Sequence, residues 1–341
     1  MSREQQRRPT MRDVADLAGV SFKTVSRVVN EEAGVSSQLV ARVEGAINVL
    51  GYRPDDGARR LRQGGSSRVI GFVLVDVANP FFSSVLRGIE EVARRQGFLV
   101  LSGSTDGDVE REHQLIETFI DRRVDGLIVV PSDPAGGPLF GEIARGTPVV
   151  FLDLEPEQAA VDLIRTDHLG GATIATKHLL RHGHTDIAFL GDDAAVFSAG
   201  LRLRGYEQAM IEAGLPVREE HIICGNHAPE RWYELALALM RGPDSPTALF
   251  TAQNFVTIGA VRALHHLGLH RQIALVGFDE VELATAVEPG ITVVPQYPLD
   301  LGRRAAEVLF ARLAGLTSPL QREVIVNSLI ARGSGEIRPP R

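Results

Sequence analysis

The spacing of apolar residues changes near residue 66, and the part before this point predicts helices. Between residues 10 and 51, apolar positions recur three or four residues apart in three short runs. The runs follow Thr10, Ser21 and Ser36, whose hydroxyl oxygens can accept hydrogen bonds from the first turn of a helix. Gly51 ends the third run. We therefore expect a small all-α unit of three helices.

The part after residue 68 alternates between strand and helix patterns. Amphipathic stretches predict helices, among them 81–95, 229–241 and 254–267. Near-continuous apolar strands between such helices indicate parallel sheets covered on both faces. We expect an α/β bilobed core with two parallel sheets, and ligands at the carboxyl ends of the strands. The runs rich in Val, Ile and Leu that predict strands are 69–77, 98–102, 126–131, 148–154, 187–190, 221–224, 248–252 and 273–278.

The two patterns are joined by a segment with its own composition. Pro54 can open a short helix, and residues 63–67 (Gln-Gly-Gly-Ser-Ser) are typical of a flexible linker. We therefore divide the chain into a helical unit at 1–53, a hinge helix and linker at 54–67, and a core at 68–341.

The charge distribution favours a polyanion as partner of the first unit. The whole chain has a net charge of −7, but residues 1–65 have 11 basic and 8 acidic residues. This unit is therefore at +3 and the remainder at −10, as expected when one module binds nucleic acid. A single cysteine, no apolar signal segment and no run of about 20 apolar residues favour a cytoplasmic protein that does not enter a membrane.

The first two predicted helices have the spacing of a helix-turn-helix, whose second helix enters the major groove of DNA. At its start, Lys23 can donate to guanine and Phe22 can pack on thymine methyl groups. A structural pair of helices with a solvated basic face has the same pattern. The expected DNA-binding residues of this unit are Thr10, Ser21, Phe22, Lys23, Thr24, Ser26, Arg27 and Asn30.

Longer motifs resemble one family throughout the chain. The segments Thr10–Ser21 and Thr24–Asn30, followed by Leu50-Gly51-Tyr52-Arg53-Pro54, closely resemble the lactose/galactose-repressor (LacI/GalR) family of bacterial transcription regulators. The core agrees through Asn79-Pro80-Phe81-Phe82, Arg87-Gly88-Ile89-Glu90, Arg202-Leu203-Arg204-Gly205-Tyr206, Val276-Gly277-Phe278-Asp279 and Ala331-Arg332-Gly333-Ser334.

The resemblance implies a repressor that binds a near-palindromic DNA operator as a homodimer. The segment after Pro54 would be a hinge helix that forms on the operator, with Leu61 wedged into the minor groove. The implied DNA-binding residues of the hinge are Ala58, Arg59, Leu61 and Arg62. This chain departs from the family at Asp55-Asp56-Gly57, because glycine disfavours a helix, so we expect a hinge that folds less readily without DNA.

The resemblance also implies a periplasmic-binding-protein-like core that closes on a small effector. Its lobes would be about 68–167 with 296–325, and about 168–295 with 326–334. The expected effector-binding residues are Asp76, Phe81, Phe82, Asp153, Arg202, Gln253 and Asp279. Such carboxylates, an arginine and an aromatic face suit a sugar or a related polyol or nucleoside.

Several alternatives stay open for this core. An ion pair would also explain Arg202 and Asp279, and core packing would explain Phe81. The family's usual Ala-Asn-Asp is Ala252-Gln253-Asn254 here, which leaves the effector class open. Release or co-repression by the effector, including a purine, and a sugar-binding module without DNA function remain possible.

No pattern in the chain indicates catalysis. The sequence lacks a Gly-x-Gly-x-x-Gly after the first strand, a Walker loop and a Gly-x-Ser-x-Gly, so we expect neither an enzyme nor a cofactor. His178 and His182 have helical spacing, but nothing completes a ligand set, so we expect no metal. The last residues show no leucine heptads, which favours a dimer over a tetramer.

Overall fold

The computed structural model describes residues 9–30, 32, 34–53, 66–132, 137–154, 161–282 and 284–340. The chain divides into two compact units, residues 1–67 and 68–341, and each is described by itself. The segment between Arg53 and Ser66, with the predicted hinge residues Ala58, Arg59, Leu61 and Arg62, lies outside the described residues.

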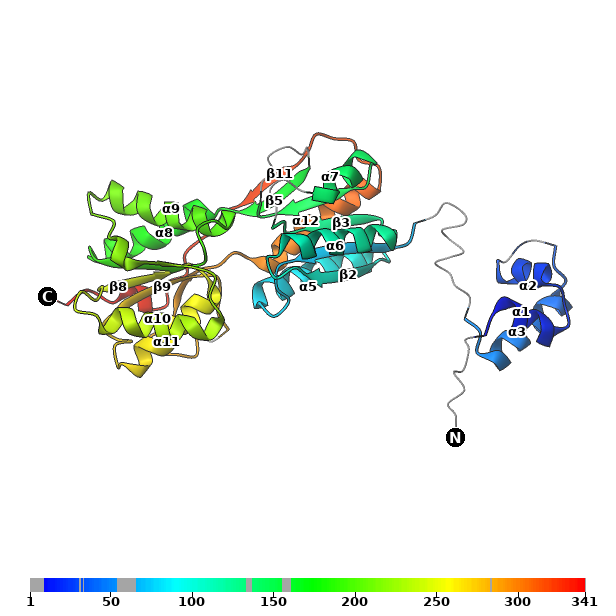
Figure 1. Ribbon diagram of the computed structural model, residues 1–341, viewed down its shortest axis with the longest axis horizontal. Coiled ribbons are helices and arrows are strands. Elements are labelled where there is room, and N and C mark those ends of the chain that lie inside the picture. The colour runs from blue at the N-terminus through cyan, green and yellow to red at the C-terminus, as the bar shows by residue number, and fades with distance from the viewer. Residues whose placement is uncertain are drawn as a thin grey trace. The chain divides into compact units, whose positions relative to one another are not determined.

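The first unit is a three-helix bundle (Figure 1). Its helices are α1 (Met11–Ala18), α2 (Phe22–Val29) and α3 (Ser37–Leu50). Val14, Val25 and Val43, one from each helix, are fully buried against each other in its small core. Arg42 of α3 donates a 2.6 Å hydrogen bond to the carbonyl oxygen of Ala18, which ties the turn between α1 and α2 to the third helix.

The first lobe of the second unit is built on a six-stranded parallel sheet. The strand order is β11-β5-β4-β3-β1-β2. Helices α5 and α12 cover one face, and α6 and α7 cover the other, so the inner strands β1, β3 and β4 are apolar on both sides, as the sequence predicts. The bounds are β1 Val69–Leu74, α5 Pro80–Arg95, β2 Leu99–Ser104, α6 Val109–Asp121, β3 Gly126–Val129, α7 Gly137–Ala144, β4 Val149–Leu152, β5 Asp162–Thr166, α12 Pro298–Leu313 and β11 Arg322–Ile325.

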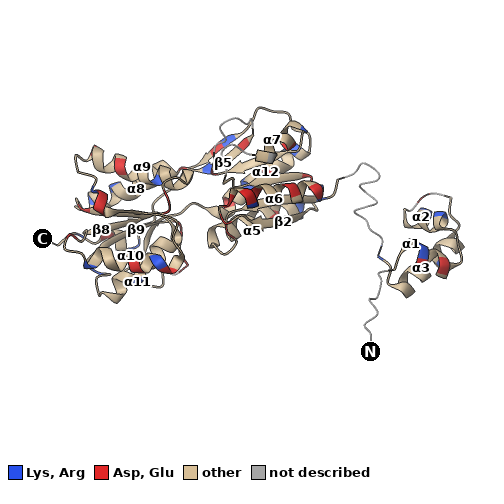
Figure 2. Ribbon diagram, viewed as in Figure 1, with Lys and Arg blue, Asp and Glu red and all other residues tan. Residues whose placement is uncertain are grey.

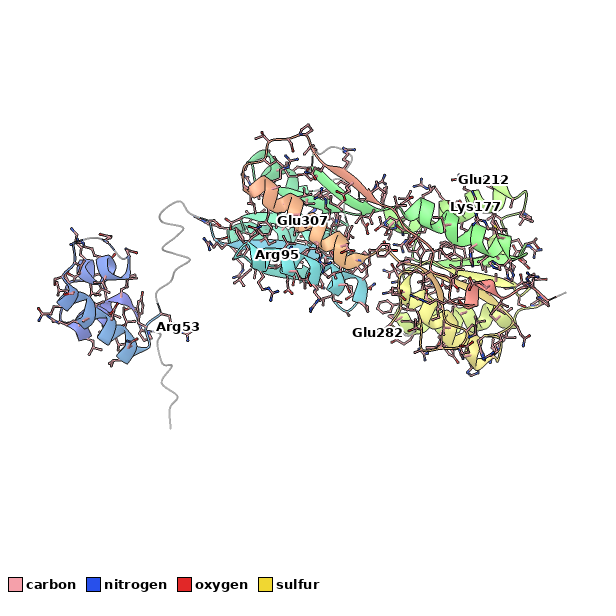
Figure 3. The ribbon with its side chains drawn as sticks, turned by 180° about the vertical axis from the view of Figure 1, so that it is seen from behind. Arg53, Arg95, Lys177, Glu212, Glu282 and Glu307 are labelled. Carbon is pink, nitrogen blue, oxygen red and sulfur yellow. The ribbon has the colours of Figure 1, made fainter. Side chains whose placement is uncertain are left out.

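The second lobe repeats this arrangement on a five-stranded parallel sheet in the order β10-β9-β8-β6-β7. Helices α8 and α9 cover one face and α10 and α11 the other. A 2.7 Å ion pair between Lys177 and Glu212 fastens α8 to α9 at the surface (Figure 3). The bounds are α8 His168–Arg181, β6 Ile187–Gly191, α9 Phe197–Glu212, β7 Ile222–Cys224, α10 Pro229–Arg241, β8 Ala248–Thr251, α11 Asn254–His266, β9 Ala274–Phe278 and β10 Thr292–Val294, with 3-10 turns at Glu219–His221 and Ser334–Glu336.

The chain passes between the lobes three times. It leaves the first lobe after β5, returns after β10 to form α12 and β11, and then crosses back after β11. Two hydrogen bonds join these crossovers. The amide of Asp167 donates to the carbonyl oxygen of Ile325 at 3.0 Å, and the hydroxyls of Tyr297 and Ser328 lie 2.7 Å apart. The predicted bilobed fold with a helical first unit is confirmed.

Helices α5 and α12 approach each other at two glycines. A Cβ placed on Gly302 would lie 2.1 Å from the carbonyl oxygen of Val85, and one on Gly88 would lie 2.2 Å from the carbonyl oxygen of Leu299. Because both carbonyls belong to backbone, neither can move aside as a side chain would. The close packing of α5 against α12 in the first lobe therefore requires glycine, which has no Cβ, at these two positions.

Several predicted strands are shorter than the apolar pattern indicates, and polar contacts or turns explain two of them. The strand predicted at 69–77 ends at Leu74, because Asp76 accepts a hydrogen bond from Ala78 in a turn that leads into α5. The strand predicted at 221–224 begins at Ile222, because His221 closes a 3-10 turn. Within the described part of the chain, no helix has the length and apolar character needed to span a membrane.

Candidate functional site

The start of α2 presents an exposed apolar ring beside an exposed cation. Phe22 keeps 52% of its surface accessible, and Lys23 next to it is exposed as well. Helix α2 has two basic residues and no acidic one (Figure 2). A large ring left in solvent at a helix start is suited to a contact with a partner, since the unit's own core is made elsewhere.

The other residues expected to bind DNA along α2 already have contacts within the unit. Ser21 is the N-cap of α2 and accepts a 3.1 Å hydrogen bond from the amide of Thr24, whose hydroxyl lies 2.9 Å from that of Ser21. The amide of the Asn30 side chain donates to the hydroxyl of Ser26 at 3.2 Å. These contacts fix the helix start and its last turn, while the side chains of Phe22 and Lys23 stay exposed at the start of α2.

Thr10 has a local role that the sequence pattern also predicts. Its hydroxyl and backbone amide both donate to the carboxylate of Asp13 at 2.7 Å, and its hydroxyl accepts from the amide of Asp13 at 3.4 Å. This reciprocal arrangement is a capping box at the N-terminus of α1.

We expect Thr10→Ala to destabilise the three-helix unit by about 1 kcal/mol, because it removes the cap of α1. Thr10→Ser retains the hydroxyl and should leave the stability unchanged. Calorimetric unfolding of the full chain measures both variants. Equal stability of Thr10→Ala and the parent chain would show that the cap contributes nothing.

In the second unit, a chain of polar contacts joins the two lobes through Arg202. This residue of α9 is 6% exposed, and its guanidinium donates to Nδ1 of His168 at 3.3 Å and to the carbonyl oxygen of Ala252 at 2.6 Å. The guanidinium also lies 4.5 Å from the centre of the Phe278 ring. Nε2 of His168 lies 3.1 Å from the carboxylate of Asp153, at the end of β4 in the first lobe.

This geometry defines the tautomer of His168. A guanidinium can only donate, so Nδ1 of His168 must accept, and the ring proton is on Nε2, where it is donated to Asp153. Burial raises the pKa of the Asp153 carboxyl, but interactions with His168, the charge of Arg202 and the amide of Thr166 outweigh burial and lower it. Asp153 is therefore an ionised acceptor, and His168 orients it.

Asp279 is held from two sides at the end of β9. The amide of Asn254 donates to one carboxylate oxygen at 3.3 Å, and the side-chain amide of Gln296 donates to the other. The side chain is buried, and burial raises its pKa above the ordinary value, although Arg202 and both donors oppose this rise. Asp279 is a carboxylate of fixed orientation that can still accept hydrogen bonds.

The carboxyl groups of Asp153 and Asp279 both belong to residues with backbone in the left-handed region. The φ angle is 65° at Asp153 and 75° at Asp279, values that residues other than glycine rarely adopt. Each of the two residues directly follows the last residue of a strand, Asp153 after β4 and Asp279 after β9. Such conformations gather at binding sites, where the surrounding structure holds them in place.

Three residues of this site were missed by sequence analysis. His168 contacts Arg202, Gln296 contacts Asp279, and Asp192 lies near both; we call Asp153, Arg202, Asp279 and these contacts the Arg202–Asp279 group. Burial and the charge of Asp279 raise the pKa of Asp192 above its ordinary value, although Arg202 opposes this rise. Asp192 follows β6 and could have been selected by the rule that found Asp153 and Asp279. For His168 and Gln296 the sequence has no signal, because their partners are distant along the chain.

The remaining expected effector residues lie in the turn before α5, in the first turn of α5 and at the N-cap of α11. Phe81 and Phe82 pack edge to face with ring centres 5.1 Å apart, and both contact the core of the first lobe. Gln253 is the N-cap of α11, and its side-chain oxygen accepts from the amides of Phe255 and Val256. Asp76 stays half-buried in its turn. The contacts of Phe81 and Gln253 are thus partly structural.

No group of three or more possible metal ligands occurs in the described ranges. His178 contacts Glu336, and Nδ1 of His182 lies 2.9 Å from the carbonyl oxygen of His178. The Arg202–Asp279 group has no nucleophile beside a base, but it offers fixed donors and acceptors from both lobes. Such a set is suited to hold a small polar molecule by its hydroxyl groups.

Comparisons with known proteins match both units. The description "Bacterial regulatory proteins, lacI family" matches residues 10–55, and "Periplasmic binding protein-like domain" matches residues 176–335. The ribose operon repressor of Escherichia coli (strain K12) is 34% identical over 329 residues, which cover 95% of this chain and 99% of that protein. The repressor PurR of Aliivibrio fischeri is 33% identical over 89% of this chain and 91% of its own length. The crystal structure of the lac repressor dimer, bound to operator and the anti-inducer ONPF, is 27% identical with a TM-score of 0.79, covering 96% of this chain and 99% of that one.

Proposed function

Because the chain belongs to the LacI family of bacterial regulatory proteins and is therefore a DNA-binding transcriptional regulator, we propose that it is a sugar-released repressor. It binds a near-palindromic operator as a homodimer, and ribose is the first candidate effector. Its place of action is the bacterial cytoplasm, on DNA. The group formed by the buried His168, Arg202 and Asp279 and the partly buried Asp153 carries the effector part of this proposal.

The chemistry of the group supports a polyol effector. Asp153 and Asp279 can each accept from hydroxyls, and the guanidinium of Arg202 can donate to a ring or hydroxyl oxygen. The ribose operon repressor, similar over almost its whole length, supports a pentose among the polyols. Residues from both lobes take part, so a ligand bound to them changes the relative free energies of the lobe arrangements.

Exposed apolar residues on the first lobe support the dimer. Strand β2 is an edge strand, and Leu99 and Leu101 on it are 72% and 37% exposed. Covering such an edge with a second copy removes apolar surface from water. The lac repressor, related in structure over 96% of this chain, is named as a dimer on its operator.

The experiment that tests the function is selection of genomic DNA fragments on the purified full chain. Fluorescence anisotropy then measures the affinity for the selected fragment with ribose, with glucose and with a purine base. We expect a palindrome whose affinity falls on addition of ribose. Tighter binding of the fragment in the presence of a purine would mean that the effector is a co-repressor and not an inducer. An absence of any enriched fragment would refute the DNA-binding part of the proposal.

Lys23→Ala is the matched variant for the DNA part of the proposal. Loss of one good base contact lowers discrimination by about 1–3 kcal/mol. Ribose binding, measured by calorimetry, should be unchanged in this variant, because residue 23 belongs to the other compact unit. Weaker ribose binding in Lys23→Ala would show general damage to the protein.

A further inference from the structure

Two asparagine side chains form a hydrogen bond from one lobe to the other. Asn79 is the N-cap of α5 in the first lobe, and Asn254 is the first residue of α11 in the second lobe. The side-chain nitrogen of Asn254 donates to the side-chain oxygen of Asn79 at 2.8 Å. The two residues are 175 positions apart, and neither lies on a crossover segment.

The orientation of both amides is set by their own helices. The oxygen of Asn79 also accepts a 3.0 Å hydrogen bond from the amide of Phe81, so an oxygen must face the helix start. The oxygen of Asn254 accepts from the amide of Phe255 at 2.8 Å, which turns its nitrogen toward Asn79. Because capping holds an acceptor at Asn79, its partner at position 254 must be a donor.

Position 254 is where this chain departs from its family, in the triplet Ala252-Gln253-Asn254. An ionised carboxylate at position 254 has no proton to donate. Its negative oxygens would face the side-chain oxygen of Asn79, which also has a negative partial charge, and the two would repel each other. The amide of Asn254 provides the required donor while it is 4% exposed. The side-chain amide of Asn254 therefore supplies the donor that this contact between the lobes requires.

The same residue also contacts the candidate effector site. The backbone amide of Asn254 donates to the carboxylate of Asp279 at 3.3 Å, while its side chain donates to Asn79. A rotation of one lobe against the other must break or lengthen the bond to Asn79. A ligand on Asp279 that also contacts the first lobe favours the arrangement in which this bond is intact.

We propose that Asn79 and Asn254 form a latch that holds the two lobes in the arrangement required for effector binding. Both are positioning residues, since they act through the lobes and through Asp279. The effector part of this inference rests on the proposed function. A net contribution typical of one hydrogen bond makes the latch responsible for about a 3- to 10-fold difference in effector affinity.

The first test measures the latch without any ligand, by hydrogen exchange of the full chain. Asn79→Ser retains an N-cap but cannot reach Asn254, and Asn254→Ala removes the donor. We expect Asn79→Ser to speed exchange at the start of α11, and Asn254→Ala to speed exchange at the start of α5. Exchange that changes only in the substituted helix would overturn the latch, whatever the effector is.

The second test measures ribose affinity by calorimetry for both variants and for the double variant. We expect each single substitution to weaken ribose binding about 3- to 10-fold. The double variant should bind ribose no less tightly than the single variant that has the lower affinity. Asn254→Asp should weaken binding more than Asn254→Ala, because its carboxylate repels the oxygen of Asn79. Additive effects, or equal affinities in all variants, would overturn the role in binding.

Gln114→Ala is the matched control, because it removes an exposed side-chain amide from α6. It should change neither exchange at α5 and α11 nor ribose affinity. If the parent chain does not bind ribose at all, the choice of effector fails while the exchange experiment still decides the latch. The two failures are therefore distinguishable.

Discussion

Asp279→Ala is expected to weaken ribose binding at least about 100-fold and to abolish release from the operator. The carboxylate is oriented by Gln296 and by the amide of Asn254, so it meets a ligand without further ordering. Each charge-assisted hydrogen bond to a hydroxyl contributes about 1.5–3 kcal/mol, and one carboxylate can accept two of them. Operator affinity without sugar should stay within a few-fold of the parent chain.

Calorimetry with ribose and anisotropy with operator DNA measure the two effects separately. Asp279→Asn keeps the volume but replaces one acceptor oxygen by a donor, so it should also lose most of the affinity. Asp121→Asn, an exposed carboxylate on α6, is the control and should respond to ribose as the parent chain does. Normal release of the Asp279→Ala variant by ribose would remove Asp279 from the effector site.

Gly302→Ala is expected to lower the free energy of unfolding by about 3 kcal/mol. The new methyl group would lie 2.1 Å from the carbonyl oxygen of Val85. Helix α12 would have to move away from α5, and the side chains between the two helices would lose their contacts. Chemical denaturation followed by circular dichroism measures the change.

Gly141→Ala is the control for the substitution itself. Gly141 lies in α7 of the same lobe, and the nearest atom to an added Cβ is a guanidinium nitrogen of Arg145 at 3.9 Å. Alanine favours a helix over glycine by about 1 kcal/mol, so this variant should be as stable as the parent chain or more stable. Equal stability of Gly302→Ala would show that the two helices do not meet as closely as described.

Most helices and strands could be predicted because their apolar periodicity is local. The helix expected at 81–95 is present as Pro80–Arg95, and the one expected at 229–241 is present with those bounds. The ends of helices and strands were predicted less well where a hydrogen bond from a polar side chain determines them. Asp76 bonds to the turn after β1 and ends that strand three residues before the apolar pattern stops.

The candidate site was predicted in part, for a comparable reason. Asp153, Arg202 and Asp279 could be selected by their place in family motifs and at strand ends. The network that orients them could not, because His168, Gln296 and Asn254 acquire their roles from partners 15 to 175 residues away. A sequence shows which side chains can donate or accept, but only the fold shows which of them meet.

The order in which the first lobe is assembled has a consequence for protein synthesis. Its sheet receives the edge strand β11 (Arg322–Ile325) and the covering helix α12 (Pro298–Leu313) only from the last part of the chain. During synthesis, the three-helix unit therefore emerges from the ribosome long before the residues that complete the first lobe are made. A premature stop codon upstream of residue 298 would produce a fragment without a finished lobe. Such a fragment should be cleared by proteases rather than accumulate and compete with the intact repressor for its operator.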